Sequence, residues 1–149
     1  SWLWGGTPEA IFETIRVGIN SAHPESRTSQ MPAFGHDGML KSAEIDNVVV
    51  FVRSLSNPTA KDLSAAKVAA GKTLFAANCA ACHGEDAKGN SEVGAPNLTD
   101  AVWLYGSSEA TIVETILNGR DNQMPAQEKH LTAEQIRLLA AWVWGQSNH

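Results

Sequence analysis

The sequence repeats itself, and this repeat limits what the chain can fold into more than any other feature. Trp2-Leu3-Trp4-Gly5 returns as Trp103-Leu104-Tyr105-Gly106, and Gln30-Met31-Pro32-Ala33 returns unchanged as Gln123-Met124-Pro125-Ala126. The other matching positions are Ile11 and Ile112, Glu13 and Glu114, Thr14 and Thr115, Ile15 and Ile116, Gly18 and Gly119, Ile45 and Ile136, Val48 and Leu139, Phe51 and Trp142, and Val52 and Val143. Such self-similarity indicates two copies of one structural unit.

Two of the expected helices are counterparts in the repeat. Thr7, followed by Pro8, can cap a helix that Gly18 ends, because threonine accepts from the first free N–H groups and proline suits the first helical position. Ser108 can cap the equivalent helix in the second copy, and Gly119 ends it.

Two further segments also have helical patterns. Ser64 can cap a helix that runs to Cys79 and carries Val68, Gly71, Leu74 and Phe75 on one face. Thr132 and Gln135 form a capping box before a last helix with Ile136, Leu139, Ala140 and Val143 inward. No stretch shows the alternation of a strand, so the predicted fold class is all-α.

The chain has two cysteines, which stand in Cys79-Ala80-Ala81-Cys82-His83. This is the spacing of c-type haem attachment. Each thiol can add to one of the two vinyl groups of a porphyrin, and the adjacent His83 then lies under the iron as its proximal ligand. The motif predicts one covalently bound haem c.

Other interpretations of the cysteine pair fit less well. A thioredoxin-like dithiol needs a βαβ setting, and no strand pattern precedes Cys79. A structural zinc ion needs four ligands, whereas Cys79, Cys82 and His83 supply three. A chance occurrence of the motif is the third alternative.

Met124 is the predicted distal ligand, because it precedes a proline in a polar loop between two helical patterns. A thioether ligand favours Fe(II) and raises the potential. His130 is a weaker candidate, as a surface residue just before a helix. The carbonyl of Pro96 is the candidate acceptor for the second N–H of His83, since ligating histidines usually donate it. By the repeat, Met31 is the distal ligand of another haem.

The repeat also divides the chain. Residues 1–57 are predicted to be the C-terminal part of a first domain, whose cysteines would lie upstream of Ser1. Residues 58–63 form the linker, and residues 64–149 form a complete second domain.

Cys79 to His83, Pro96-Asn97-Leu98 and Met124-Pro125 together resemble class I cytochrome c domains. The resemblance implies two tandem domains, the first truncated at its N-terminal side. It also places Gly71 and Phe75 at the contact of the N-terminal helix, with Trp142 as the aromatic partner. The two Trp-Leu-Trp/Tyr-Gly segments and the loop Ser29 to Gly35 resemble, in addition, the dihaem subunit III family of cbb3-type cytochrome c oxidases.

That family implies a function in one-electron transfer, as a non-catalytic subunit of an oxygen-reducing, proton-translocating respiratory complex. Electrons would enter from a cytochrome c donor and pass to the monohaem cytochrome subunit and the haem–copper catalytic subunit. The full-length protein would carry a second haem c. A membrane anchor upstream of Ser1 would hold both domains on the periplasmic side of the bacterial inner membrane.

Four alternatives remain open at this stage. They are a soluble dihaem cytochrome, the cytochrome subunit of a periplasmic dehydrogenase, an open-site haem enzyme or gas sensor in which Met124 is not bound, and a non-haem interaction module with a redox-active dithiol. The net charge of −5 lacks the basic footprint of a nucleic-acid binder and suits a basic electron donor. Every apolar run in the sequence, such as Val48 to Val52, is far shorter than the ~20 residues of a membrane span.

Overall fold

The computed structural model describes residues 2–60 and 62–147. Ser1 and Lys61, which belong to the predicted first domain and linker, lie outside the described residues, as do the last two residues of the predicted second domain. The helices are α1 (Pro8–Val17), α2 (Ser42–Ser56), α3 (Ala65–Asn78), α4 (Ala80–His83), α5 (Glu109–Asn118) and α6 (Ala133–Ser147). Between residues 2 and 147, with 61 left out, extended residues form only isolated pairings and no strand. The predicted all-α class is confirmed.

The predicted helix starts are also confirmed. The hydroxyl of Thr7 accepts a hydrogen bond from the Ala10 amide at 3.1 Å. The hydroxyls of Ser64 and Ser108 accept from the amides three residues further on, at the starts of α3 and α5. Before α6, the Thr132 amide donates to the Gln135 side chain at 2.9 Å, and the Gln135 amide donates to the Thr132 hydroxyl at 3.3 Å. These bonds satisfy amides that a helix leaves without a partner in its first turn.

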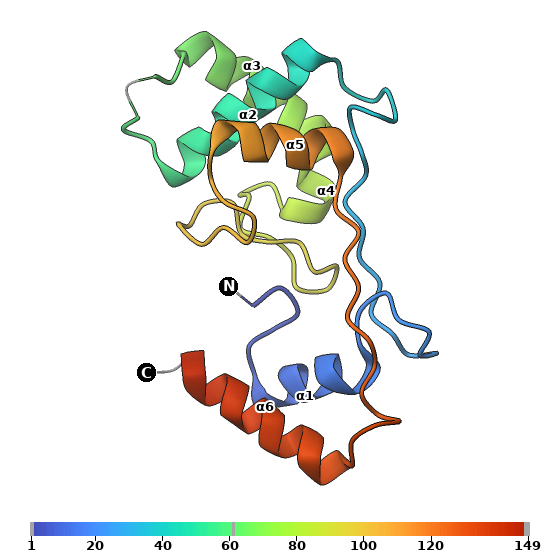
Figure 1. Cartoon of the computed structure of the whole chain (residues 1–149). Coiled ribbons are helices and arrows are strands. Elements are labelled where there is room, and N and C mark those ends of the chain that lie inside the picture. Colours follow the sequence, from blue (N-terminus) through green and yellow to red (C-terminus); the bar gives the residue numbers. More distant parts are fainter. Residues whose placement is uncertain (1, 61, 148–149) are drawn as a thin grey trace. The chain divides into compact units, whose positions relative to one another are not determined.

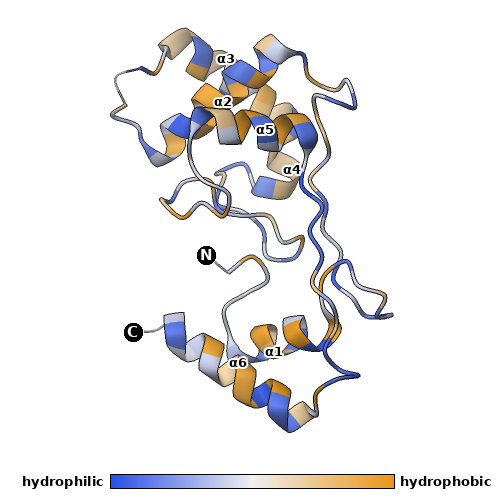
Figure 2. Cartoon of the chain, in the orientation of Figure 1, coloured by the Kyte–Doolittle hydropathy of each residue, from blue (hydrophilic) through white to orange (hydrophobic). Residues whose placement is uncertain are grey.

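Residues 31–90 and 95–120 form the first of two compact units, which we call unit 1. It contains α2, α3, α4 and α5, and α2 lies along α3 (Figure 1). The apolar side of α2 supplies much of the core. Figure 2 shows the hydrophobic residues of this helix in orange, between hydrophilic ones in blue. Its buried residues are Ile45, Val48, Val49, Val50, Phe51 and Val52.

Residues 2–30, 91–94 and 121–147 form unit 2, in which α1 packs against α6 (Figure 1). Its core is smaller and consists of Ile11, Ile15, Ile136 and Ala140, with Phe12, Met124, Leu131 and Val143 packed at its edge. The sequence predicts that Leu139 points inward, but 41% of its surface is exposed. The buried stripe of α6 is narrow, because the short helix α1 covers only one side of it.

The two units do not follow the order of the repeat. The α2 helix belongs to the first copy and packs with helices of the second copy, whereas α1 of the first copy packs with α6 of the second. The predicted boundaries, with the linker at 58–63, describe the order of the copies along the sequence and stay a prediction. Each compact unit draws helices from both copies.

Candidate haem-attachment site

The two cysteines lie at the junction of α3 and α4, where the chain makes one helical turn. The amide of His83 donates to the carbonyl of Cys79 at 2.9 Å, and Gly84 ends the turn in a left-handed conformation. Cys79 is buried in the core of unit 1, and Cys82 is exposed. Both are free thiols, as covalent attachment of a porphyrin requires.

The His83 ring is held by the loop that follows α4. Its Nδ1 lies 3.1 Å from the carbonyl oxygen of Pro96, and because a carbonyl only accepts, Nδ1–H is the donor. This is the contact that the sequence predicts. The remaining nitrogen, Nε2, keeps its lone pair and is the atom that can bind a metal.

The loop itself is fixed by backbone hydrogen bonds. The amide of Gly89 donates to the carbonyl of His83 at 2.8 Å, and the amide of Leu98 donates to the carbonyl of Ala87 at 2.8 Å. Gly89 has a φ of 86°, and a Cβ there would overlap the backbone at Ala95. Glycine is therefore needed where this loop turns back to bring Pro96 under the imidazole.

An aromatic contact connects His83 to the helices. The Phe75 ring on α3 lies 6.4 Å from the His83 ring, between centroids, and 5.3 Å from the Phe51 ring on α2. The aromatic partner of Phe75 is therefore Phe51. The resemblance led us to expect Trp142 as this partner, and that expectation is wrong for this structure. Trp142 lies on α6 in unit 2, with 64% of its surface exposed.

Burial favours the neutral forms of the His83 imidazole and the Cys79 thiol. It lowers the pKa of His83, against the opposing effect of the hydrogen bond to Pro96, and so favours the neutral imidazole that ligates metals. Burial likewise raises the pKa of the Cys79 thiol to about 11, with a smaller contribution from Cys82. The residues present fit a covalently attached haem, with two free thiols one turn apart and an oriented, neutral imidazole.

The two predicted distal ligands lie in different units. Met31 packs against the core of unit 1, to which Cys79 also belongs. Met124 packs against the core of unit 2. The structure therefore brings Met31, Cys79, Cys82, His83 and Pro96 into one unit, and Met124 into the other. Sequence reasoning missed that the two copies of the repeat exchange helices, so that α2 packs with α3 and α1 packs with α6. No motif indicates this exchange, because the two copies have similar sequences.

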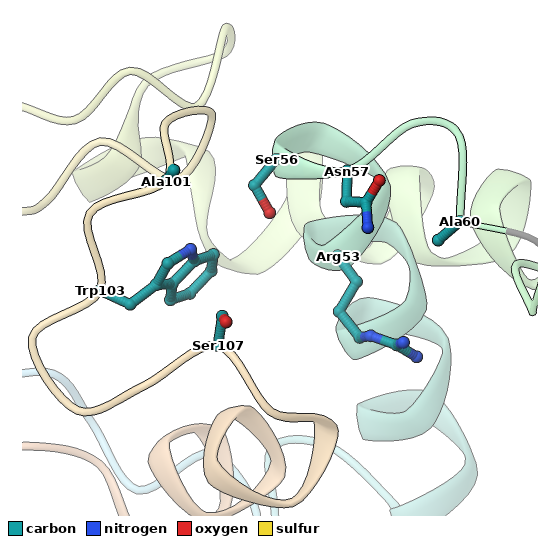
Figure 3. Close-up of a pocket in the computed structure, with 7 residues that line it drawn as sticks. All are labelled: Arg53, Ser56, Asn57, Ala60, Ala101, Trp103 and Ser107. Atoms are coloured by element: carbon teal, nitrogen blue, oxygen red, sulfur yellow. The ribbon is translucent and has the colours of Figure 1, made fainter.

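A pocket of about 210 Å³ lies elsewhere in unit 1 (Figure 3). Arg53 and Ser56 of α2 line one side, and the Trp103 indole lines the other. Neither cysteine nor His83 borders it. It is smaller than the ~300 Å³ at which ligand pockets usually begin, and Arg53 already binds Glu109 and Asp62.

Residues 2–60 and 62–147 contain no cluster of three or more His, Cys, Asp or Glu side chains arranged to hold a metal ion. In the same part of the chain, no helix has both the length and the apolar character needed to cross a membrane.

Comparison with known proteins identifies similar sequences. A family model described as cytochrome C oxidase, cbb3-type, subunit III matches residues 66–143. The cbb3-type cytochrome c oxidase subunit FixP of Bradyrhizobium sp. (strain ORS 278) is 56% identical over 143 residues, which cover 95% of this chain and 48% of the relative. The subunit CcoP of Cereibacter sphaeroides is 50% identical over 145 residues, which cover 97% and 49%. The chain thus spans about half the length of the curated relatives it matches.

Proposed function

We propose that this chain, which belongs to the family of subunit III of cbb3-type cytochrome c oxidases, carries single electrons on haem c. Cys79 and Cys82 would hold the porphyrin through two thioether bonds, and Nε2 of His83 would bind its iron. When bound, haem c supplies a reversible one-electron couple.

The observation that carries this proposal is the geometry of His83. Pro96 accepts from Nδ1 at 3.1 Å and fixes the tautomer, so that Nε2 is available on the same turn as both thiols. Phe75 packs beside the ring and limits its rotation. An imidazole held in this way need not reorganise when the charge on its metal changes, and low reorganisation suits electron transfer.

A methionine sulfur would occupy the position opposite His83 and leave no open site for oxygen chemistry. The repeat assigns this role to Met124, and assigns Met31 the same role on a second haem c of the full-length protein. The proposed function requires a methionine as the second protein ligand of the iron, besides His83, and it does not depend on whether Met124 or Met31 supplies the sulfur.

The similar proteins FixP and CcoP are named as subunits of cbb3-type cytochrome c oxidases, which supports a place in an oxidase complex. We infer that the full-length protein is a subunit of a cbb3-type oxidase that receives electrons from a cytochrome c donor. It would pass them to the monohaem cytochrome subunit and then to the haem–copper subunit. An anchor outside this chain would hold it on the periplasmic side of the inner membrane.

Haem attachment can be tested on the chain itself. Production in a bacterium with haem c attachment machinery should give a red protein whose colour survives denaturing electrophoresis. Cys79→Ser with Cys82→Ser should lose the covalent haem, and His83→Gln should lose the low-spin spectrum. His130→Gln is the matched control, since its imidazole lies just before α6 and outside unit 1. A colourless wild-type protein would contradict the proposal, and rapid binding of carbon monoxide to the reduced wild type would favour an open site.

A test of membership in an oxidase complex requires the full-length membrane protein. Native purification should recover further haem- and copper-containing subunits, and the preparation should consume oxygen with reduced cytochrome c as donor. A protein that purifies alone and consumes no oxygen would instead be a free or dehydrogenase-linked carrier.

A further inference from the structure

Four hydrogen bonds converge on the side chain of Asn20, in unit 2. Its Nδ2 donates to the carbonyl of Ser29 at 2.7 Å and to the carbonyl of Asn122 at 2.8 Å. Its Oδ1 accepts from the amide of Ser29 at 3.0 Å. A further contact, from Nδ2 to Oδ1 of Asp121, is longer at 3.2 Å. The carboxamide therefore uses its donors and its acceptor at once, and only one orientation of the group satisfies these partners.

The strongest partners of Asn20 stand just before the two predicted sulfur ligands. Ser29 lies two residues before Met31, and Asn122 lies two residues before Met124. Both partners contact the carboxamide through their backbone, so the contact fixes the course of the chain rather than the position of one side chain. The side chain of Asn20 thus joins the two segments that lead to the methionines.

The backbone around Asn20 supports this position. Asn20 has a left-handed φ of 49°, which asparagine tolerates better than most residues that carry a side chain. The preceding residue, Ile19, pairs with Met124 through two backbone hydrogen bonds, both at 2.9 Å. The segment that leads to Met124 is therefore held twice, by the backbone of Ile19 and by the side chain of Asn20.

The loop that follows Asn20 closes without its side chain. The Asn20 amide donates to the carbonyl of Arg27 at 2.7 Å, and the Ser21 amide donates to the Ser26 hydroxyl at 2.9 Å. The Ser21 hydroxyl donates to the carbonyl of Val17 at 2.7 Å. Because these bonds already fix the loop, the carboxamide of Asn20 acts on the two methionine-bearing segments instead.

The second copy of the repeat has a different residue at this position. Asp121 is the counterpart of Asn20, since each stands two residues after the glycine that ends the preceding helix. A carboxylate only accepts hydrogen bonds, so it could not donate to the carbonyls of Ser29 and Asn122. The amide that joins the two segments therefore depends on asparagine in the first copy.

We propose that Asn20 is a positioning residue for electron transfer: its carboxamide holds the two methionine-bearing segments together and so keeps the ligating sulfur on the iron. A methionine leaves the iron only when its segment moves, and movement of either segment breaks hydrogen bonds of Asn20. The inference rests on the proposed function, because it needs the haem. It applies whether Met31 or Met124 supplies the sulfur.

The test measures how readily added imidazole displaces the methionine from the iron of the haem-loaded 149-residue chain. Asn20→Gly removes the carboxamide and keeps a backbone that adopts positive φ without strain. Asn57→Gly is the matched control, because the Asn57 side chain accepts from the hydroxyl of Thr59 at 3.3 Å, two residues further along the same loop. The readout is the loss of the far-red sulfur-to-iron absorption of the oxidised protein as imidazole is added.

We expect Asn20→Gly to raise the apparent affinity for imidazole at least about fivefold, because a moving segment no longer has these hydrogen bonds to break. Asn57→Gly should change the affinity by less than about twofold, as is usual for exposed positions. Glycine separates the two roles of Asn20, since a residue needed only for its left-handed backbone would be replaced by glycine without effect.

A second measurement needs no substitution and still decides the question if Asn20→Gly fails to fold. In the isotope-labelled wild-type protein, the two side-chain amide protons of Asn20 should exchange slowly with water, and their resonances should shift when imidazole replaces the methionine. Exchange as fast as in a free asparagine, or resonances that imidazole leaves unmoved, would overturn the inference.

The outcomes separate this inference from the proposed function. An apparent affinity that is equal in Asn20→Gly and the wild type would overturn the inference and leave the proposed function intact. An equal rise in Asn57→Gly would also overturn it, because the effect would then follow from any such change in a loop. A wild type without attached haem, or without the far-red absorption before imidazole is added, would contradict the proposed function itself.

Discussion

Cys79 and Cys82 are three residues apart and have very different surroundings. The α3 helix carries Cys79 into the core of unit 1, and the turn that follows leaves Cys82 at the surface. Attachment of haem at both thiols therefore requires that the apoprotein open locally around Cys79, or that attachment precede the closure of the core.

The difference in burial between Cys79 and Cys82 predicts which thiol is modified first in the apoprotein. At pH 8 iodoacetamide should alkylate Cys82 at least about tenfold faster than Cys79, because the reactive species is the thiolate, and burial raises the pKa of Cys79 to about 11. Peptide mass spectrometry after short labelling measures the two rates. In denaturant the rates should converge, and equal rates in the folded apoprotein would contradict the buried position of Cys79.

Two helical glycines form a matched pair for testing the contact between α2 and α3. Gly71→Ala should lower the free energy of unfolding by ~1–3 kcal/mol, because the new methyl group overlaps the α2 backbone. Gly145→Ala on α6 should raise it by up to ~1 kcal/mol, because alanine favours the helix and the new methyl group has no atom within 4 Å apart from its chain neighbours and the nearby backbone of its own helix. Urea unfolding followed by circular dichroism measures both values. An equal response of the two variants would mean that α3 does not lie against α2.

At the scale of the helix, α1 of unit 2 ends in a group of charged side chains. Arg16 binds Glu13 at 2.6 Å, Glu25 at 2.9 Å and Glu128 at 2.8 Å, and Glu128 also contacts the His23 ring at 2.6 Å. The hydrogen bond from Arg16 lowers the pKa of Glu13, and the hydrogen bonds from His23 and then Arg16 lower that of Glu128. These contacts join the end of α1 to the loop before α6.

This group predicts how unit 2 responds to acid. A carboxyl whose pKa is lowered on folding stabilises the folded chain above its unfolded pKa of about 4.3, and the stabilisation is lost as the pH falls through the lower folded value. Arg16→Gln should therefore flatten the fall in urea midpoint between about pH 5 and pH 3. Lys88→Gln, which removes a long, exposed ion pair to Asp86, is the control. A slope unchanged in Arg16→Gln would exclude this group as the acid-sensitive element.

For the whole molecule, the exchange of helices is the feature with the widest consequences. Phe51 and Trp142 are equivalent in the repeat, so their substitution separates the exchanged arrangement from one in which each copy folds on its own. Phe51→Ala should lower the free energy of unfolding by ~3–5 kcal/mol, because it removes a buried ring from the core of unit 1. Trp142→Ala should change it by no more than ~0.5 kcal/mol, as is usual for exposed residues.

Thermal and urea unfolding of the two variants give these values, and near-ultraviolet circular dichroism shows whether the aromatic environment of unit 1 persists. The reverse pattern, with a severe effect of Trp142→Ala and a mild one of Phe51→Ala, would show that α6 rather than α2 packs beside α3.

The sequence by itself determined the local features. The caps at Thr7, Ser64 and Ser108 depend only on residues within one turn, and the Cys79–His83 spacing depends only on chain geometry, so both can be read from the order of residues. The family also followed from short motifs, each of which consists of a few neighbouring residues and can be read without the fold.

The tertiary structure alone decided which copy supplies each partner. The segments Gln30–Ala33 and Gln123–Ala126 are identical, so no local preference decides whether Met31 pairs with Ile19 of its own copy or with Arg120 of the other copy. In the structure the backbone of Met31 pairs with that of Arg120, and the backbone of Met124 pairs with that of Ile19. The choice depends on long-range packing, where the broad apolar face of α2 fills the space beside Gly71 and Phe75. The two pairings make similar sets of contacts, so their free energies differ only through long-range packing. That packing exists only when the whole chain is folded.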